Sequence, residues 1–101
     1  MVNILLCCNE GMSTSYLVNK MKQVAEQHQL KVTIKAVPEP QVDVHAKEAD
    51  VIMLGPQIAF LEEKIKARVN IPVETINKED FGKINAGNVL KRALTIVKES
   101  R

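Results

Sequence analysis

The fold of this chain is decided by Val2-Asn-Ile-Leu-Leu-Cys7 and by the residues that follow at once, Cys8-Asn-Glu-Gly-Met-Ser-Thr-Ser15. The first stretch is almost wholly apolar and predicts a buried strand, whereas a helical pattern begins in the second. Gly11 and three successive hydroxyl residues predict a tight turn between them. Such a turn directs backbone N–H groups and the positive end of a helix at one small volume, which suits an anion or a thiolate. Cys8 lies at the mouth of that volume.

The composition is typical of one small globular domain. The chain has 101 residues, of which 46% are hydrophobic, so we expect a single domain over residues 1–101. A formal charge of +2 and an aromatic content of 3% argue against a nucleic-acid surface. No apolar run approaches the ~20 residues of a membrane span, and the N-terminus lacks the pattern of a signal peptide. We therefore expect a cytoplasmic protein without direct membrane insertion.

The two cysteines are adjacent in sequence, and neighbouring side chains of a strand point to opposite faces. A disulfide between Cys7 and Cys8 is therefore not expected, and both should be thiols in a reducing compartment. His28 and His45 stand far from the cysteines in sequence, and no metal-binding spacing occurs. We predict neither a metal site nor a cofactor. Cys7 is interpreted as a small buried residue at the end of its strand.

Strand and helix patterns alternate along the rest of the chain. Helices are predicted from about Ser13 to about Gln29, through Ile58, Leu61, Ile65 and Val69, and through Val89, Leu90, Ala93, Leu94 and Val97. Further strands are predicted at Lys31–Val37, Val51–Leu54 and Ile71–Ile76. Pro38-Glu-Pro40 leads into a polar connection, and Asn77 is placed to cap a short turn through Lys78 to Phe81. This order predicts an α/β domain of three layers, with a four-stranded parallel sheet flanked by helices.

Ligands of parallel sheets bind beyond the carboxyl ends of the strands. Cys8, Pro38 to Pro40, Gly55 to Gln57 and the Asn77 region all follow predicted strands. We therefore expect them to share one rim, and we place the active site there. Gln57 could reach the loop after Cys8 from the neighbouring strand, although a hydrogen bond to the start of its own helix is about as consistent with the sequence.

The chemistry of the turn points to a cysteine that carries a phosphoryl group. A free thiol is mostly protonated at neutral pH, so a nucleophilic cysteine needs a setting such as a helix N-terminus that stabilises its anion. We predict that the phosphate-binding residues are Asn9, Glu10, Gly11, Met12, Ser13, Thr14 and Ser15, through their amides and through the hydroxyls of the last three. Helix capping is the alternative role of each hydroxyl. The charge of Glu10 opposes a bound phosphate, so we expect its side chain to point to water.

The spacing invites comparison with the loop of the low-molecular-weight tyrosine phosphatases, in which five residues separate a cysteine from an arginine. Here Thr14 occupies the arginine position. Without the guanidinium that stabilises a phosphoryl-transfer transition state, efficient hydrolysis is not expected. Asp43, Glu48 and Asp50 also have no context that marks a general acid. A phosphatase-like or arsenate-reductase-like thiol enzyme is kept as the alternative, and a non-catalytic anion-binding regulator as a third.

Several motifs together resemble the enzyme IIB components of the bacterial phosphoenolpyruvate-dependent sugar phosphotransferase system (PTS), in the lactose, cellobiose and diacetylchitobiose branch. These are Cys8-x-x-Gly-Met-Ser-Thr-Ser15, Pro38-Glu39, the stretch from Ala49 through Gly55-Pro-Gln-Ile58, Pro72-Val-Glu74 and Phe81-Gly82. The resemblance covers nearly the whole chain. It implies a flavodoxin-like winding of the sheet, similar to that of the low-molecular-weight phosphatases.

The resemblance also implies a transferase. Cys8 would accept a phosphoryl group from a histidine of enzyme IIA and pass it to a sugar, of the β-linked disaccharide class, held by the membrane component IIC. Near Cys8, Met12 is in the turn, and helical spacing places Tyr16 on the polar face of the first helix. We expect these two side chains to form a docking surface for the partners, the alternative being that they pack the loop.

Overall fold

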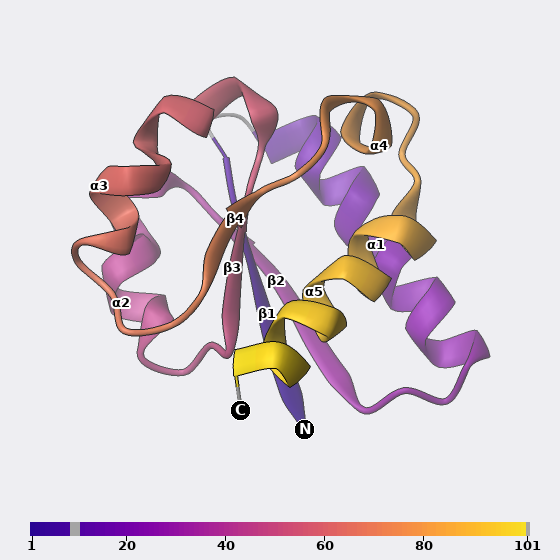
Figure 1. Cartoon of the computed structure of the whole chain (residues 1–101). Helices are drawn as coiled ribbons and strands as arrows, with labels where there is room; N and C mark the ends of the chain where they lie inside the picture. The colour runs from indigo at the N-terminus through magenta and orange to yellow at the C-terminus, as the bar shows by residue number, and fades with distance from the viewer. Residues whose placement is uncertain (9–10, 101) are drawn as a thin grey trace.

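The computed structural model describes residues 1–8 and 11–100. Its centre is a four-stranded sheet in the order β2-β1-β3-β4, in which every pairing is parallel. Helices lie on both sides of the sheet, and the start of β1 and the last turn of α5 lie at the bottom of the view (Figure 1). The predicted α/β architecture with a four-stranded parallel sheet is confirmed. The strands are β1 (Val2–Cys7), β2 (Val32–Val37), β3 (Val51–Leu54) and β4 (Val73–Thr75).

The strands form where the sequence is most apolar. β1 and β3 are central and have the predicted bounds, and their side chains alternate between two separate hydrophobic clusters. β2 begins one residue later than predicted, and β4 is half as long as the predicted Ile71–Ile76. Ile71 and Ile76 still pack into the two clusters, which explains why they read as strand in the sequence. Burial accounts for their apolar character, and the Ile76 N–H still donates to the Leu54 carbonyl of β3 at 2.8 Å.

One face of the sheet is covered by α1 (Gly11–Gln27) and α5 (Ala86–Ser100), which cross it side by side (Figure 1). α1 starts two residues before the predicted Ser13 and stops two before the predicted Gln29. It ends there because Gln29 takes a positive φ of 55° while the Leu30 N–H donates to the Ala25 carbonyl at 2.8 Å. The cluster under these helices includes Leu17 and Met21 of α1, both fully buried.

The other face carries short helices, and here two predictions are corrected. The predicted polar connection after Pro40 contains the helix α2 (Val42–Ala46), preceded by the 3-10 turn η1 (Glu39–Gln41). Only Val42 and Ala46 of α2 are buried, and two apolar residues four apart are too weak a pattern to predict a helix.

The helix predicted from Ile58 to Val69 is a 3-10 segment, η2 (Pro56–Leu61), that leads into the short helix α3 (Glu62–Lys66). Ile58 interrupts regular geometry with φ −118° and ψ 26°, yet it is fully buried. The apolar spacing is therefore used for burial, but in a kinked segment.

Asn77 caps α4 (Lys78–Gly82), as predicted. Its Oδ1 accepts hydrogen bonds from the backbone N–H groups of Glu79 at 2.8 Å and of Asp80 at 3.3 Å. A residue with positive φ, Ile84, then turns the chain into α5. Across residues 1–8 and 11–100, none of the helices has the length and apolar character needed to cross a membrane.

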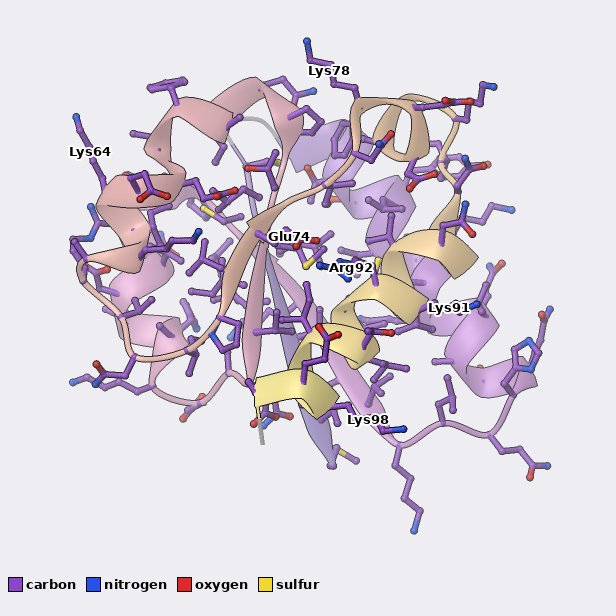
Figure 2. All side chains as sticks on the ribbon, in the orientation of Figure 1. Lys64, Glu74, Lys78, Lys91, Arg92 and Lys98 are labelled. Carbon is purple, nitrogen blue, oxygen red and sulfur yellow. The ribbon has the colours of Figure 1, made fainter. Side chains whose placement is uncertain are left out.

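The edge strand β4 is held by charged side chains from both layers. Glu62 of α3 accepts hydrogen bonds from the N–H of Thr75 at 2.9 Å and from its hydroxyl at 2.7 Å. On the other side, Arg92 of α5 forms two hydrogen bonds of 2.7 Å with Glu74, and the two side chains lie next to each other in Figure 2. Occupying the outward N–H of an edge strand also blocks pairing with another chain.

We predict that Glu62→Ala lowers the free energy of unfolding at pH 7 by about 1 kcal/mol, because the Thr75 N–H loses its partner. The pKa of Glu62 is held below its ordinary value of 4.5, chiefly by the Thr75 hydroxyl. The stabilisation is therefore complete above pH 4.5 and is lost as pH falls through the lower folded-state pKa. Urea titrations at several pH values measure this, with the neighbouring exposed Glu63→Ala as control. A difference between wild type and Glu62→Ala that grows on acidification would contradict it.

Candidate active site

The predicted rim exists at the carboxyl ends of the two central strands. Cys8 follows β1, and its N–H donates to the Val37 carbonyl of β2 at 3.4 Å. Gly55 follows β3, and its N–H donates to the Cys7 carbonyl at 2.9 Å. The parallel register thus continues one residue beyond each strand and fixes Cys8 between its two neighbours.

Cys8 and Thr14 are brought together. The Cys8 Sγ atom and the Thr14 Oγ1 atom are in hydrogen-bonding contact. Cys8 is 7% exposed, and Thr14, at 1%, is the one buried polar side chain in the part of the chain that the structure describes. A hydroxyl with this placement can donate to a thiolate, and the start of α1 at Gly11 adds the positive end of a helix on the same side. Both features lie beside the Cys8 sulfur.

The other predicted phosphate-binding residues surround Thr14 in the sequence. Asn9 and Glu10 lie outside the described residues, so the prediction that the Glu10 side chain points to water does too. Gly11, Met12 and Ser13 belong to α1, but only their backbone is described. Ser15 is exposed on α1. Their predicted phosphate contacts stay predictions.

Two exposed aromatic side chains stand on the segments that leave the rim. Tyr16, near the start of α1, is 55% exposed, with the Lys20 ammonium 5.6 Å from its ring centre. Phe60, in η2, is 74% exposed. Phe60 was not predicted as a site residue, although its position off the apolar stripe of Ile58, Leu61 and Ile65 is a usable signal in the sequence.

Gly55 lets two other groups approach each other. A Cβ atom at this position would lie 2.8 Å from Oε1 of Gln57 and 3.0 Å from Cβ of Cys8. The first separation is shorter than real Cβ contacts and the second is tighter than most of them, so a side chain at residue 55 would displace one group or the other. The Gln57 carboxamide therefore folds back over Gly55 toward the cysteine.

Cys7 is separated from this chemistry, as predicted. It is fully buried in the cluster beneath α2 and α3, and neither cysteine is in a disulfide. Burial raises the pKa of the Cys7 thiol to about 12, with smaller contributions from the negative charges of Glu39 and Cys8. Cys7 is consequently protonated and unreactive at neutral pH.

The histidines and the acids considered in the sequence do not gather at Cys8. The Nδ1 atom of His45 and the Nζ atom of Lys35 are in hydrogen-bonding contact at 3.1 Å. Asp43 pairs with Arg68 at 3.1 Å, and Asp50 accepts from the Asn3 N–H at 2.7 Å at the opposite end of the sheet. Among the described residues, no group of three or more histidine, cysteine or carboxylate side chains is arranged to hold a metal ion.

The fold and the site together define a parallel α/β domain with a cysteine at the carboxyl end of its first strand. Residues 3–92 of this domain match the family described as PTS system, Lactose/Cellobiose specific IIB subunit. The chain belongs to this family of sugar-specific PTS EIIB components.

Individual relatives agree with this assignment. The oligo-beta-mannoside-specific EIIB component of Bacillus subtilis (strain 168) is 34% identical over 96% of this chain and 97% of its own. The galactose-specific EIIB component of Lactococcus lactis subsp. cremoris (strain MG1363) is 33% identical over 89% and 91%.

Solved structures agree as well. The solution structure of the cellobiose-specific IIB component of Borrelia burgdorferi superposes with a TM-score of 0.83 at 36% identity, over 97% of this chain and 93% of that one. The lactose-specific IIB domain of Streptococcus pneumoniae also gives a TM-score of 0.83, at 16% identity over 94% and 96%, which shows the shared fold. The sheet has the flavodoxin-like winding of these domains.

We predict that iodoacetamide at pH 8 modifies Cys8 and leaves Cys7 unmodified in the folded protein. A pKa near 12 reduces the thiolate fraction of Cys7 at least about a thousandfold below that of a free thiol. Peptide mass spectrometry of Cys8→Ser and Cys7→Ala variants measures each site alone. Modification of Cys7 at the rate of a free thiol, without denaturant, would contradict this assignment.

Proposed function

We propose that this chain is a phosphocarrier of a sugar phosphotransferase system, with Cys8 as the nucleophile. The enzyme would be a protein-phosphocysteine sugar phosphotransferase acting between a phosphohistidine of enzyme IIA and a sugar bound to the membrane enzyme IIC. The observation that carries the proposal is the contact between the Cys8 thiol and the Thr14 hydroxyl at the start of α1. Membership of a family whose components work with other PTS components supports it.

The proposed reaction has two displacements at phosphorus. In the first, the Cys8 thiolate attacks the phosphorus, an S–P bond forms as the P–N bond of the phosphohistidine breaks, and the electron pair returns to the imidazole nitrogen. In the second, a sugar hydroxyl attacks and an O–P bond forms as the S–P bond breaks. The thiolate is regenerated, and the hydroxyl proton goes to a base of the sugar-binding component. No water molecule enters either step.

The residues of the turn would hold the phosphoryl group between the two steps. The N–H groups at the start of a helix have no partner within that helix and point at an anion bound beyond it. In our proposal, the amides of residues 9 to 15 bind the phosphoryl oxygens when Cys8 is phosphorylated. When Cys8 is an unphosphorylated thiolate, Thr14 Oγ1 donates a hydrogen bond to its sulfur. The hydroxyls of Ser13 and Ser15 are proposed as further donors.

The phosphatase-like and arsenate-reductase-like alternative is less consistent with the site. Thr14 takes the place of the transition-state arginine and is buried against Cys8 instead of projecting over it. A resolving cysteine is also lacking, because Cys7 is buried in the cluster on the α2 and α3 side of the sheet. The site therefore favours holding and transferring a phosphoryl group over releasing it to water.

The sugar class and the location belong to the same proposal. Relatives are named for oligo-beta-mannosides, cellobiose and galactose, and we propose a β-linked disaccharide for this chain. We also propose that the protein acts in the cytoplasm, where it would meet a IIA donor and the cytoplasmic side of a IIC acceptor.

We propose that Met12 and Tyr16 contact both partners in turn. Phe60 would extend this surface, since it is 74% exposed and lies in η2, the segment that follows β3.

We predict that Cys8→Ser abolishes acceptance of the phosphoryl group from a purified phosphohistidine IIA protein, whereas Cys7→Ala keeps most of it. Cys8 lies at the rim beside the Thr14 hydroxyl, whereas Cys7 is buried and its thiol stays protonated. Intact-protein and peptide mass spectrometry locate the added mass. Phosphate on His28 or His45 of the wild type, or normal labelling of Cys8→Ser, refutes the proposed nucleophile.

We predict that Tyr16→Asp slows transfer from the IIA protein more than about tenfold, or about 1.4 kcal/mol, with little change in the alkylation rate of Cys8. The ring is half exposed, so the unfolding midpoint should also change little. Val44→Asp is the matched control, because Val44 is an exposed apolar residue of α2. Parallel losses in transfer, alkylation and stability would show instead that Tyr16 packs the loop.

A further inference from the structure

The Gln57 carboxamide lies on the Cys8 side of Gly55, and the proposed reaction gives it no role. Its side chain is exposed to solvent, yet it does not extend outward, because Oε1 shares with Cys8 Cβ the space that the missing side chain of Gly55 leaves open. Within the described part of the chain, no hydrogen bond to this carboxamide is seen. An exposed glutamine that folds back beside a nucleophile, without an internal partner, is available to a ligand.

We propose that Gln57 binds the phosphoryl group on Cys8, with its Nε2 amide hydrogens donating to a phosphoryl oxygen. This rests on the proposed function. The oxygen and nitrogen of a carboxamide exchange places by rotation about one terminal bond, and the partner present decides the orientation. A dianionic phosphoryl group on sulfur presents only acceptors, so the Nε2 end turns toward it. The phosphoryl group would then contact the start of α1, which follows β1, and Gln57, which follows the neighbouring strand β3.

The identity of the side chain matters to this role. Gln57 is the third residue beyond β3, and Pro56 and the 3-10 geometry of η2 fix the direction in which the chain leaves the strand. A carboxamide donates hydrogen bonds without adding charge or a transferable proton. It can therefore orient the phosphoryl group without providing the cation that assists hydrolysis. Gly55 matters for the same reason, since a methyl group there would come within 2.8 Å of the carboxamide oxygen and within 3.0 Å of Cys8 Cβ.

The first test uses the unphosphorylated protein and the charge of the alkylating reagent. In Gln57→Glu, a carboxylate replaces the carboxamide at nearly constant shape. We expect the rate of Cys8 alkylation by the anion iodoacetate to fall at least about fivefold more than the rate with neutral iodoacetamide. Gln27→Glu, on the exposed last turn of α1, should leave the ratio of the two rates unchanged. An unchanged ratio in Gln57→Glu would place residue 57 away from the anion and overturn the proposal.

The second test uses the phosphorylated protein. Phosphorylation of the wild type should shift the side-chain NH2 resonances of Gln57 in ¹H–¹⁵N NMR spectra, whereas those of Gln27 stay in place. Gln57→Ala should slow phosphoryl transfer from the IIA protein about tenfold with an unchanged unfolding midpoint, and Gln57→Asn, one methylene shorter, should not restore it. Unshifted NH2 resonances, or normal transfer by Gln57→Ala, would overturn the proposal.

The outcomes separate the two proposals. If the wild-type protein takes no phosphoryl group on Cys8, the proposed function fails, and the alkylation ratio still reports whether Gln57 faces an anion at Cys8. If the wild type is phosphorylated and the Gln57 variants behave like it, the function stands and the role of Gln57 is wrong. Gly55→Ala provides an independent check: it should reproduce the altered transfer rate of Gln57→Ala if it remains folded by circular dichroism, and wild-type transfer by a folded Gly55→Ala would contradict the proposal.

Discussion

The alternation of side chains at the end of β1 is the constraint on which the site depends. Because successive residues of a strand face opposite sides, the adjacent cysteines are assigned to different environments. Cys7 is buried in the cluster under α2 and α3, where its thiol stays protonated. Cys8 faces Thr14 at the start of α1. Two residues of identical chemistry thus differ in reactivity because the sheet register, fixed by β2 and β3 on either side, does not allow them to exchange places.

The neighbouring strand completes the site. The Gly55 N–H donates to the Cys7 carbonyl, which ties the end of β3 to the end of β1, and the absence of a side chain at Gly55 leaves the space shared by Cys8 and Gln57. Residues 4–7 of β1 and all of β3 are buried, so the rim stands on the two most deeply buried strands of the sheet. Exposed rings stand on the segments that lead away from it, at Tyr16 and Phe60.

The sequence predicted those features of the fold that depend on the burial of apolar residues and on the order of strands and helices. β1 and β3 were predicted with the right bounds because every inward position is apolar, and the rim followed from the parallel order. α2 was missed because Val42 and Ala46 alone face the core, and the kink at Ile58 left no trace in its apolar spacing. The contact of Thr14 with sulfur and the folded-back Gln57 depend on close approaches between segments. Spacing along one chain carries no information about such approaches, which is why the hydroxyls could not be ranked from sequence.

The central claim is that the phosphoryl group is carried on sulfur at Cys8. The most direct measurement is a ³¹P–¹H correlation spectrum of the protein after phosphorylation by its histidine donor, because coupling through the S–P bond connects phosphorus to the two Cβ protons of one cysteine. The account predicts a single phosphorus resonance that correlates with the Cβ protons of Cys8. A correlation to the ring protons of a histidine, or to the Cβ protons of Cys7, would contradict it.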